Sequence, residues 1–174
     1  MIRQGYLRLL YRYGGIEAIN RRLLRLDRCE EILAMFGASV GGGTVIHGPL
    51  VIHNAAIDYR NLRIGDGVHL GRLTIIDLAE AVVLEEDSVV SMGSTILTHS
   101  DVGDRPLADR YPRQTAPIRI GPGAYLGANA TVLPGCDIGR ESVVGAGAVV
   151  TRPVPDGERV VGVPARATDS APTP

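Results

Sequence analysis

The C-terminal half of the chain carries an aliphatic residue at every sixth position. The series consists of Ile120, Leu126, Val132, Ile138, Val144 and Val150, and Gly directly follows four of its members. A small residue stands four positions after each of the first five, at Ala124, Ala130, Cys136, Ser142 and Ala148. A period of six matches neither the 3.6-residue turn of an α-helix nor the two-residue alternation of a half-buried strand. The pattern predicts a triangular prism in which each hexapeptide forms one side. Three hexapeptides then make one coil, and the coils stack by parallel hydrogen bonding.

The same period runs through the preceding part of the chain. Its first register is formed by Val40, Ile46, Ile52, Ile64, Leu70 and Ile76, with Asp58 as the one break. A second register, Leu84, Val90 and Ile96, follows a two-residue insertion near 77–81. A polar stretch at 99–117 interrupts the prism without loss of register, and it is too long for a corner turn. We therefore expect a parallel β-helix over 38–166 with a protruding loop at 99–117.

The N-terminal segment 1–37 shows helical spacing instead. Its apolar positions are Ile16, Ile19, Leu23, Leu26, Ile32, Leu33 and Phe36. Gly14 and Gly15 separate two predicted helices, and Gly37 is expected to end the second one. We expect these helices to pack across the first coil as an α-helical cap, because an open end of a prism exposes apolar side chains and strand edges.

Two further features belong to the chain ends. Seven Arg residues lie within the first 28 positions, so contact of the N-terminal helices with a membrane surface is an alternative to the cap that we favour less. The segment 167–174 has the composition of a disordered tail.

Composition narrows the class of protein. The net charge is −1 and only 4% of the residues are aromatic. The net charge near zero gives no support for nucleic-acid binding. The low aromatic content suits a core of stacked aliphatic side chains. Cys29 and Cys136 are too few for a disulfide framework or a metal cluster, and Cys136 is interpreted as a small core residue. No apolar stretch has the length of a membrane span and no signal sequence opens the chain, so we expect a cytoplasmic protein.

Candidate chemistry is concentrated where the regular pattern ends. A regular prism has no pocket, so function is expected at its breaks. His99 lies at the start of the polar stretch "THSDVGDRPLADRYPRQTAP" and is our candidate catalytic residue. His47 and His53 are six residues apart and are expected to form a stacked surface pair, and His69 is interpreted as structural.

Two segments resemble a known family. Residues 76–101, "IDLAEAVVLEEDSVVSMGSTILTHSD", and the C-terminal "VVGAGAVVTRPVPDGERVVGVPAR" resemble hexapeptide-repeat acyltransferases of the maltose/galactoside and colanic acid O-acetyltransferase branch. The resemblance covers roughly 62–166. It implies a left-handed parallel β-helix, a homotrimer, and acetyl transfer from acetyl-CoA to a hydroxyl of a sugar or similar acceptor, without a metal. By its position in the motif, His99 would be the general base, whose removal of a proton is worth about 10²–10⁴ in rate.

The resemblance also assigns binding residues. The family often places an Asn on the coil beneath the histidine to contact the acceptor; the matching position here is Asp77 or Arg72. Asp101 could orient His99 or start the loop turn. The positions that match the CoA-binding residues of the family are Ala128, Ala146, Thr151, Arg152 and Arg166. For the two arginines, a planar guanidinium suits the phosphates of CoA.

Three other functions are alternatives to O-acetyl transfer. Transfer to an amine, on an amino sugar or another small molecule, uses the same donor. A non-catalytic β-helix scaffold would need neither the base nor the C-terminal arginines. A γ-class carbonic anhydrase-like zinc site requires three histidine ligands, and the sequence disfavours it because no histidine follows His99.

Overall fold

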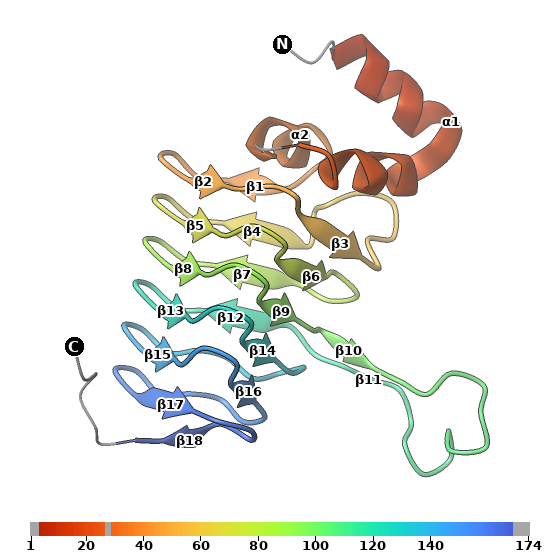
Figure 1. The fold of residues 1–174 in the computed structure, drawn as a ribbon. Helices are drawn as coiled ribbons and strands as arrows, with labels where there is room; N and C mark the ends of the chain where they lie inside the picture. Colours follow the sequence, from red (N-terminus) through yellow and green to blue (C-terminus); the bar gives the residue numbers. More distant parts are fainter. Residues whose placement is uncertain (1–3, 27–28, 169–174) are drawn as a thin grey trace.

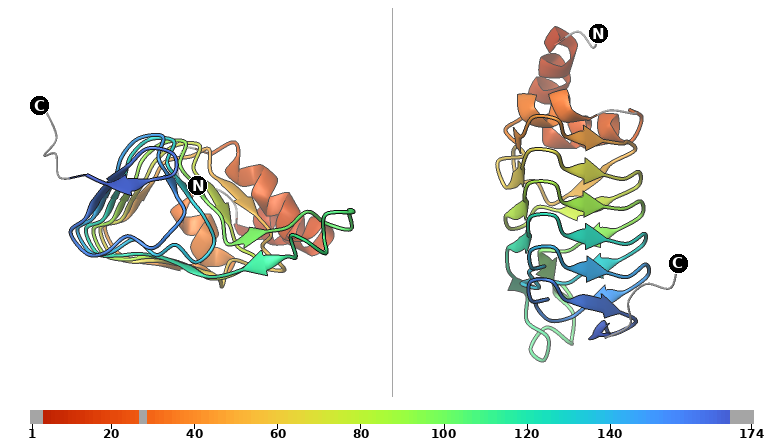
Figure 2. Two further views of the ribbon diagram at one scale, coloured as in Figure 1. Left: turned by 90° about the horizontal axis from the view of Figure 1, so that it is seen from below. Right: turned by 90° about the vertical axis from the view of Figure 1, so that its left-hand side faces the viewer.

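The chain forms a three-sided prism of short strands with two helices at one end. The computed structural model describes residues 4–26 and 29–168, and its strands are stacked one above another along the axis of the prism (Figure 1). Viewed along that axis, the coils have a triangular outline (Figure 2). The prism predicted from the six-residue period is confirmed.

Each side of the prism is one sheet with parallel neighbours. The first sheet contains β1 (Ser39–Val40), β4 (Leu62–Ile64), β7 (Val82–Leu84) and β12 (Ile118–Ile120). The second contains β2 (Val45–Ile46), β5 (His69–Leu70), β8 (Val89–Val90), β13 (Tyr125–Leu126), β15 (Val143–Val144) and β17 (Arg159–Val161), with β18 (Arg166–Ala167) antiparallel at its edge. The third contains β3 (Val51–His53), β6 (Ile75–Asp77), β9 (Thr95–Ile96), β14 (Thr131–Val132) and β16 (Val149–Val150).

The aliphatic residues of the period form the core of the prism. Ile46, Leu70, Val90, Leu126 and Val144 stack along one sheet, and all are fully buried. The small residues of the second position are buried as well, which confirms that part of the pattern: Ala124, Ala130, Cys136, Ser142 and Ala148. In the coils of the C-terminal half, each side therefore buries one aliphatic and one small side chain.

The coils are close enough that some positions exclude a side chain. A Cβ atom at Gly127 would lie 2.5 Å from the backbone nitrogen of Ala146 on the next coil. Only glycine therefore fits at this corner without movement of the backbone.

Hydrogen-bonded partners show how many residues each coil contains. Leu126 is paired with Val144, eighteen residues further on. Leu70 is paired with Val90, and the two additional residues of this coil are the insertion that the sequence predicted near 77–81.

The first coil is longer than the sequence indicated. Ile46 is paired with Leu70, twenty-four residues further on, and the six extra residues lie in the turn between β3 and β4, the 54–61 turn. Asp58 belongs to this turn and accepts hydrogen bonds from the side chain of Arg60. The interpretation of Asp58 as an imperfect position of the prism is therefore wrong. An insertion of one repeat length leaves the six-residue period intact, so the period did not reveal it.

The polar stretch after Thr98 is a projecting hairpin. Strands β10 (His99–Ser100) and β11 (Gln114–Thr115) pair antiparallel, and residues 101–113 join them away from the prism (Figures 1 and 2). The coil continues after the hairpin, because Ile96 on one side of it is paired with Val132 on the other.

The helices α1 (Gln4–Leu23) and α2 (Glu30–Met35) lie at the end of the prism that carries β1 (Figure 1). α1 is kinked at Gly15, whose φ is 60°, at the predicted break. The second predicted helix is not continuous, because the chain leaves the helix after Leu23 and starts a new one at Glu30. This break lets both segments bury apolar side chains, such as Ile19 and Leu33, in the same cluster as the prism core. Within the described residues, no helix is both long and apolar enough to cross a membrane.

The C-terminal end of the described chain is joined to the last coil. Ala167 is paired with Val160, and the backbone N–H of Thr168 donates to the carbonyl of Arg159 at 3.0 Å. The prediction of a disordered tail from 167 onward is therefore wrong for its first two residues. The remainder, 169–174, lies outside the described residues.

Candidate active site

His99 lies at the base of the hairpin and faces a cavity of about 500 Å³. Its side chain is 27% exposed, and the preceding residue, Thr98, is fully buried. The hairpin and the outer face of two later coils form the walls of this cavity. The lining residues include Leu97, Asp101, Gln114, Leu133, Cys136 and Thr151.

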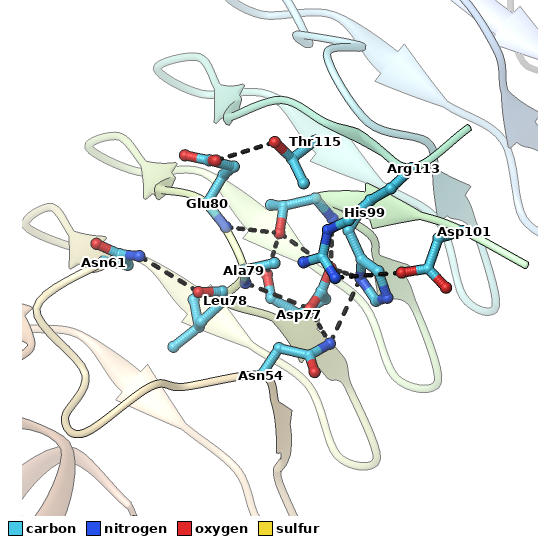
Figure 3. Close-up of polar contacts among 11 residues, drawn as sticks. Asn54, Asn61, Asp77, Leu78, Ala79, Glu80, His99, Asp101, Arg113 and Thr115 are labelled. Carbon is cyan, nitrogen blue, oxygen red and sulfur yellow. Dashed lines mark hydrogen bonds and ion pairs between the residues drawn. The ribbon is translucent and has the colours of Figure 1, made fainter. Parts of the chain in front are cut away.

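The imidazole of His99 is paired with a buried carboxylate. Its Nδ1 atom lies 2.6 Å from Oδ2 of Asp77, which comes from the end of β6 on the coil beneath (Figure 3). A carboxylate only accepts hydrogen bonds, so Nδ1 of the neutral ring carries the hydrogen and Nε2 keeps a lone pair. The pair, which we call the dyad, therefore presents a nitrogen that can accept a proton.

The protein supplies several donors to Asp77. The backbone N–H of Thr98 and its hydroxyl each lie 2.9 Å from Oδ2, and the side-chain amide of Asn54 donates to Oδ1 at 2.6 Å. Burial alone would raise the pKa of the Asp77 carboxyl, but hydrogen bonds from His99, Asn54 and Thr98 outweigh burial and hold the pKa below its ordinary value. Asp77 is thus a stable anion beside the imidazole.

The expected contact of Asp77 with an acceptor is not supported. Asp77 is 1% exposed, and both of its oxygens accept hydrogen bonds from within the chain. The position that the resemblance assigned to acceptor binding instead holds the orienting partner of His99. The sequence identified the residue but not its role.

Asn54 is a site residue that the sequence analysis missed. It follows β3, whose His53 is paired in register with Asp77, and it is the first residue of the 54–61 turn. Recognising that turn as an insertion would have aligned Asn54 with the corner that carries the dyad. Because the insertion has the length of one repeat, it leaves the period intact, and its one sign in the sequence is Asp58, the polar residue in the aliphatic register.

Asp101 stabilises the start of the loop that joins the two strands of the hairpin. Its carboxylate accepts a hydrogen bond from the backbone N–H of Gly103 at 3.0 Å. It accepts another from Arg113 at 3.2 Å (Figure 3). Of its two expected roles, starting the loop turn is supported, and Asp77 takes the other role of orienting His99.

Arg72 is far from the dyad in the fold. It lines a second hollow, of about 480 Å³, at another corner of the prism, together with His47, His69, Met92 and Ala128. The rings of His47 and His69 are in contact, with centroids 5.1 Å apart and planes tilted by 57°. The expected pairing of His47 with His53 is therefore wrong, because successive hexapeptides lie on different sides of the prism.

The positions expected to bind CoA are divided between the corners of a single chain. Thr151 lines the cavity of His99, and the exposed Arg152 follows it. Ala128 lines the second hollow; Ala146 occupies the equivalent corner one coil further on. Arg166 is exposed at the sheet edge, where its Nη1 donates to the carbonyl of Ala165 at 2.8 Å.

Family comparison agrees with this architecture. The model "Bacterial transferase hexapeptide (six repeats)" matches residues 117–152, and "Hexapeptide repeat of succinyl-transferase" matches residues 61–98. The chain is a hexapeptide-repeat protein. The resemblance to hexapeptide-repeat acyltransferases that the sequence indicated is confirmed.

Individual relatives of this hexapeptide-repeat protein include acetyltransferases with different acceptors. Serine acetyltransferase of Escherichia coli is 35% identical over 115 residues, which cover 66% of this chain and 36% of the relative. Galactoside O-acetyltransferase of Escherichia coli is 29% identical over 109 residues, covering 59% of this chain and 53% of the relative. The chain thus spans 36% to 53% of the length of these two relatives.

A solved structure extends the likeness to the whole fold. A hexapeptide-repeat-containing acetyltransferase from Vibrio cholerae, complexed with acetyl-coenzyme A, superimposes with a TM-score of 0.75 and 21% identity, covering 96% of this chain and 90% of the other. The fold is therefore the left-handed parallel β-helix that the resemblance implied.

Proposed function

We propose that this protein is a CoA-dependent O-acyltransferase that moves an acetyl group from acetyl-CoA to a hydroxyl of a sugar or another small acceptor. The observation that carries the proposal is the 2.6 Å contact between Nδ1 of His99 and the buried carboxylate of Asp77. It gives the cavity an oriented base, and a scaffold would have no use for one. The relatives that act on serine and on galactoside support a hydroxyl-bearing acceptor.

The dyad supplies the proton transfers of the reaction. In the proposed step, Nε2 of His99 takes the hydroxyl proton while the acceptor oxygen forms a bond to the thioester carbonyl carbon. The tetrahedral intermediate then breaks its carbon–sulfur bond, and the imidazolium returns the proton to the departing CoA sulfur. Asp77 stabilises the imidazolium between these two steps without taking its proton, because its low pKa keeps it ionised.

The donor would lie along the C-terminal coils. Thr151 supports this placement because it lines the same cavity as His99. Arg152 directly follows Thr151, Arg166 lies in β18, and both side chains are exposed. A guanidinium can bind a phosphate with two parallel hydrogen bonds. We propose that these arginines hold the phosphates of CoA, and that Ala128 and Ala146 contact its pantetheine arm through their backbone.

We also propose that the protein works as a homotrimer. Ala128 and Arg72 line one corner hollow of the chain, whereas His99 and Thr151 line another. Three prisms packed side by side would bring the two corners of neighbouring copies together and complete the site. We propose that α1 and α2 act as the cap of each prism in this assembly, and that the reaction takes place in the cytoplasm, where acetyl-CoA is available.

The proposal is tested by acetyl-CoA binding and by thiol release. We expect calorimetry to show binding of acetyl-CoA to the wild type, with affinity retained in His99→Ala and weakened in Arg166→Ala. Release of CoA thiol should depend on a hydroxyl acceptor and be lost in His99→Ala. A wild type that binds no acetyl-CoA would favour the scaffold, and release driven only by amines would favour N-acyl transfer.

A further inference from the structure

Asn54 contacts the dyad from outside the regular coils. Its side-chain Nδ2 donates to Oδ1 of Asp77 at 2.6 Å and lies 3.4 Å from Nδ1 of His99 (Figure 3). Both nitrogens are donors when the His99 ring is bonded to Asp77, so the amide hydrogen bond goes to the carboxylate. Asn54 therefore acts on His99 only through Asp77.

The two oxygens of Asp77 are held from different directions. Oδ2 accepts hydrogen bonds from Thr98 and His99. Oδ1 accepts the short bond from Asn54 and a longer one, at 3.3 Å, from the backbone N–H of Ala79. Loss of the Asn54 amide would leave Oδ1 with the longer bond alone. The plane of the carboxylate would then be fixed mainly from the Oδ2 side.

The backbone holds Asn54 in a fixed place. Its φ is 55°, in the left-handed region that Asn adopts more readily than most residues. The turn that follows is fastened to the N-terminal helices by Tyr59, whose backbone N–H donates to the carbonyl of Phe36 at 2.8 Å and whose hydroxyl donates to Asn20 at 2.8 Å. The insertion thus ties the residue beside the dyad to the helical end of the protein.

We propose that Asn54 is a positioning residue of the active site, which fixes the Asp77 carboxylate so that it holds His99 in the reactive tautomer and orientation. The inference rests on the proposed acyltransferase function. It assigns a purpose to the 54–61 turn, which delivers the short amide hydrogen bond to Oδ1 of Asp77, beside the longer bond from Ala79.

Three other titratable side chains lie around the dyad: His53, Glu80 and Asp101. His53 is the in-register neighbour of Asp77 on the coil beneath. The Glu80 carboxylate accepts a hydrogen bond from Thr115 at 3.0 Å, and Asp101 is paired with Arg113 at the hairpin mouth. These groups remain the same in the variants below, so a change in pH dependence would be due to position 54.

Two substitutions separate the amide from the backbone conformation. Asn54→Gly removes the donor and tolerates the positive φ. Asn54→Asp keeps the shape and places a second carboxylate against Oδ1 of Asp77. Asn61→Ala is the matched control, because it removes a 3.3 Å amide bond from the same turn to the carbonyl of Leu78 without touching the dyad.

We expect kcat to fall about tenfold in Asn54→Gly, the loss typical of one hydrogen bond to a charged group. KM for acetyl-CoA and for the acceptor should stay unchanged. The pKa of the Asp77 carboxyl should rise, because the Asn54 bond is one of those that lower it. Asn54→Asp should raise this pKa further, since a neighbouring like charge raises the pKa of a carboxyl.

Three results would overturn the proposal. One is an unchanged kcat together with an unchanged pKa of Asp77 in both Asn54 variants. A second is a change confined to the KM of the acceptor, which would make Asn54 a substrate contact. The third is an equal effect in Asn61→Ala with a matching loss of thermal stability, which would show a merely structural role.

Carboxyl ¹³C titration of Asp77 tests the same inference without any activity. We expect the pKa of Asp77 to rise in Asn54→Gly and to stay at the wild-type value in Asn61→Ala. If the wild type transfers no acetyl group but the titration behaves as expected, the proposed function fails and the positioning of Asp77 stands. A pKa of Asp77 that is the same in all three proteins refutes the positioning itself.

Discussion

Thr98 and Asp77 lie on successive coils and are joined through both the backbone and the side chain of Thr98. The backbone N–H donates to Oδ2 of Asp77 at 2.9 Å, and the hydroxyl lies 2.9 Å from the same oxygen and 3.0 Å from the carbonyl of Asp77. The hydroxyl also accepts from the backbone N–H of Glu80 at 3.1 Å. One buried threonine thus links the carboxylate, the corner beneath it and the strand that carries His99.

Thr98→Val keeps the shape of this side chain and removes its hydroxyl. The N–H of Glu80 would lose its acceptor and Asp77 one of its donors, so we expect the free energy of unfolding to fall by about 1–3 kcal/mol. Urea unfolding measures this change. A free energy within error of the wild type would mean that water replaces the hydroxyl at no cost.

Asp77→Asn tests the orienting role of the carboxylate in catalysis. An amide that keeps its bond from the Thr98 N–H can no longer hold His99 as a carboxylate does, and its NH₂ group can instead donate to Nδ1. The ring would then carry its hydrogen on Nε2, where the base is needed. We expect kcat to fall by about a hundredfold or more, with acetyl-CoA affinity in calorimetry unchanged. Activity near the wild-type value would exclude the dyad.

The low pKa of Asp77 also makes stability depend on pH. Its folded-state pKa lies below the unfolded value of about 3.9, because hydrogen bonds from His99, Asn54 and Thr98 outweigh the opposing effect of burial. The corresponding stability is fully present above the unfolded pKa and is lost as pH falls through the folded one. Unfolding free energies at pH 6 and pH 3 should therefore differ less in Asp77→Asn than in the wild type. An equal difference in both proteins would contradict this assignment.

Tyr59→Phe probes the attachment of the 54–61 turn to α1. Tyr59 is fully buried, burial raises the pKa of its phenol, and its hydroxyl donates to Oδ1 of Asn20, which is itself buried. Removing the hydroxyl leaves that acceptor without this donor, so we expect a loss of about 1–3 kcal/mol in the free energy of unfolding. Thermal melts followed by circular dichroism would show it. Tyr11→Phe is the control, because its hydroxyl bond to Ile57 is exposed.

Gly127→Ala tests the close approach of two coils in the C-terminal half. The added Cβ would lie 2.5 Å from the Ala146 nitrogen, so the coils must separate locally. We expect a destabilisation of about 1–3 kcal/mol and weaker acetyl-CoA binding. Gly5→Ala is the matched control, since a Cβ there meets nothing within 4 Å and lies in α1, where alanine is the better helix former. Equal melting temperatures for the two variants would show that the coils yield freely.

The parts of the fold that repeat could be predicted from the sequence, and the parts that occur once could not. The period identified the inward residues, the small residues beside them and the presence of a protruding loop after Thr98, because each follows from counting in sixes. Counting could not detect the 54–61 turn, whose extra length equals one repeat, and so Asn54 was missed. The break between α1 and α2 was missed for another reason: apolar spacing continues across it, although the chain changes direction there.

The candidate site shows the same division. His99 could be predicted because it stands where the pattern stops. The role of Asp77 could not, because its distance in sequence from His99 depends on the extra residues of that coil, and a carboxylate at a corner is compatible with either solvent or burial. Only the register of β6 and β9 placed the side chain under the imidazole.

The hairpin has a consequence for how this protein can change over evolution. Its two strands leave and rejoin the same coil, and Ile96 and Val132 remain partners across it. The joining residues 101–113 can therefore be lengthened, shortened or exchanged while the stacked coils keep their alignment. Under the proposed function, a lineage could in this way acquire a new acceptor by replacing one surface segment, with His99 and Asp77 inherited unaltered.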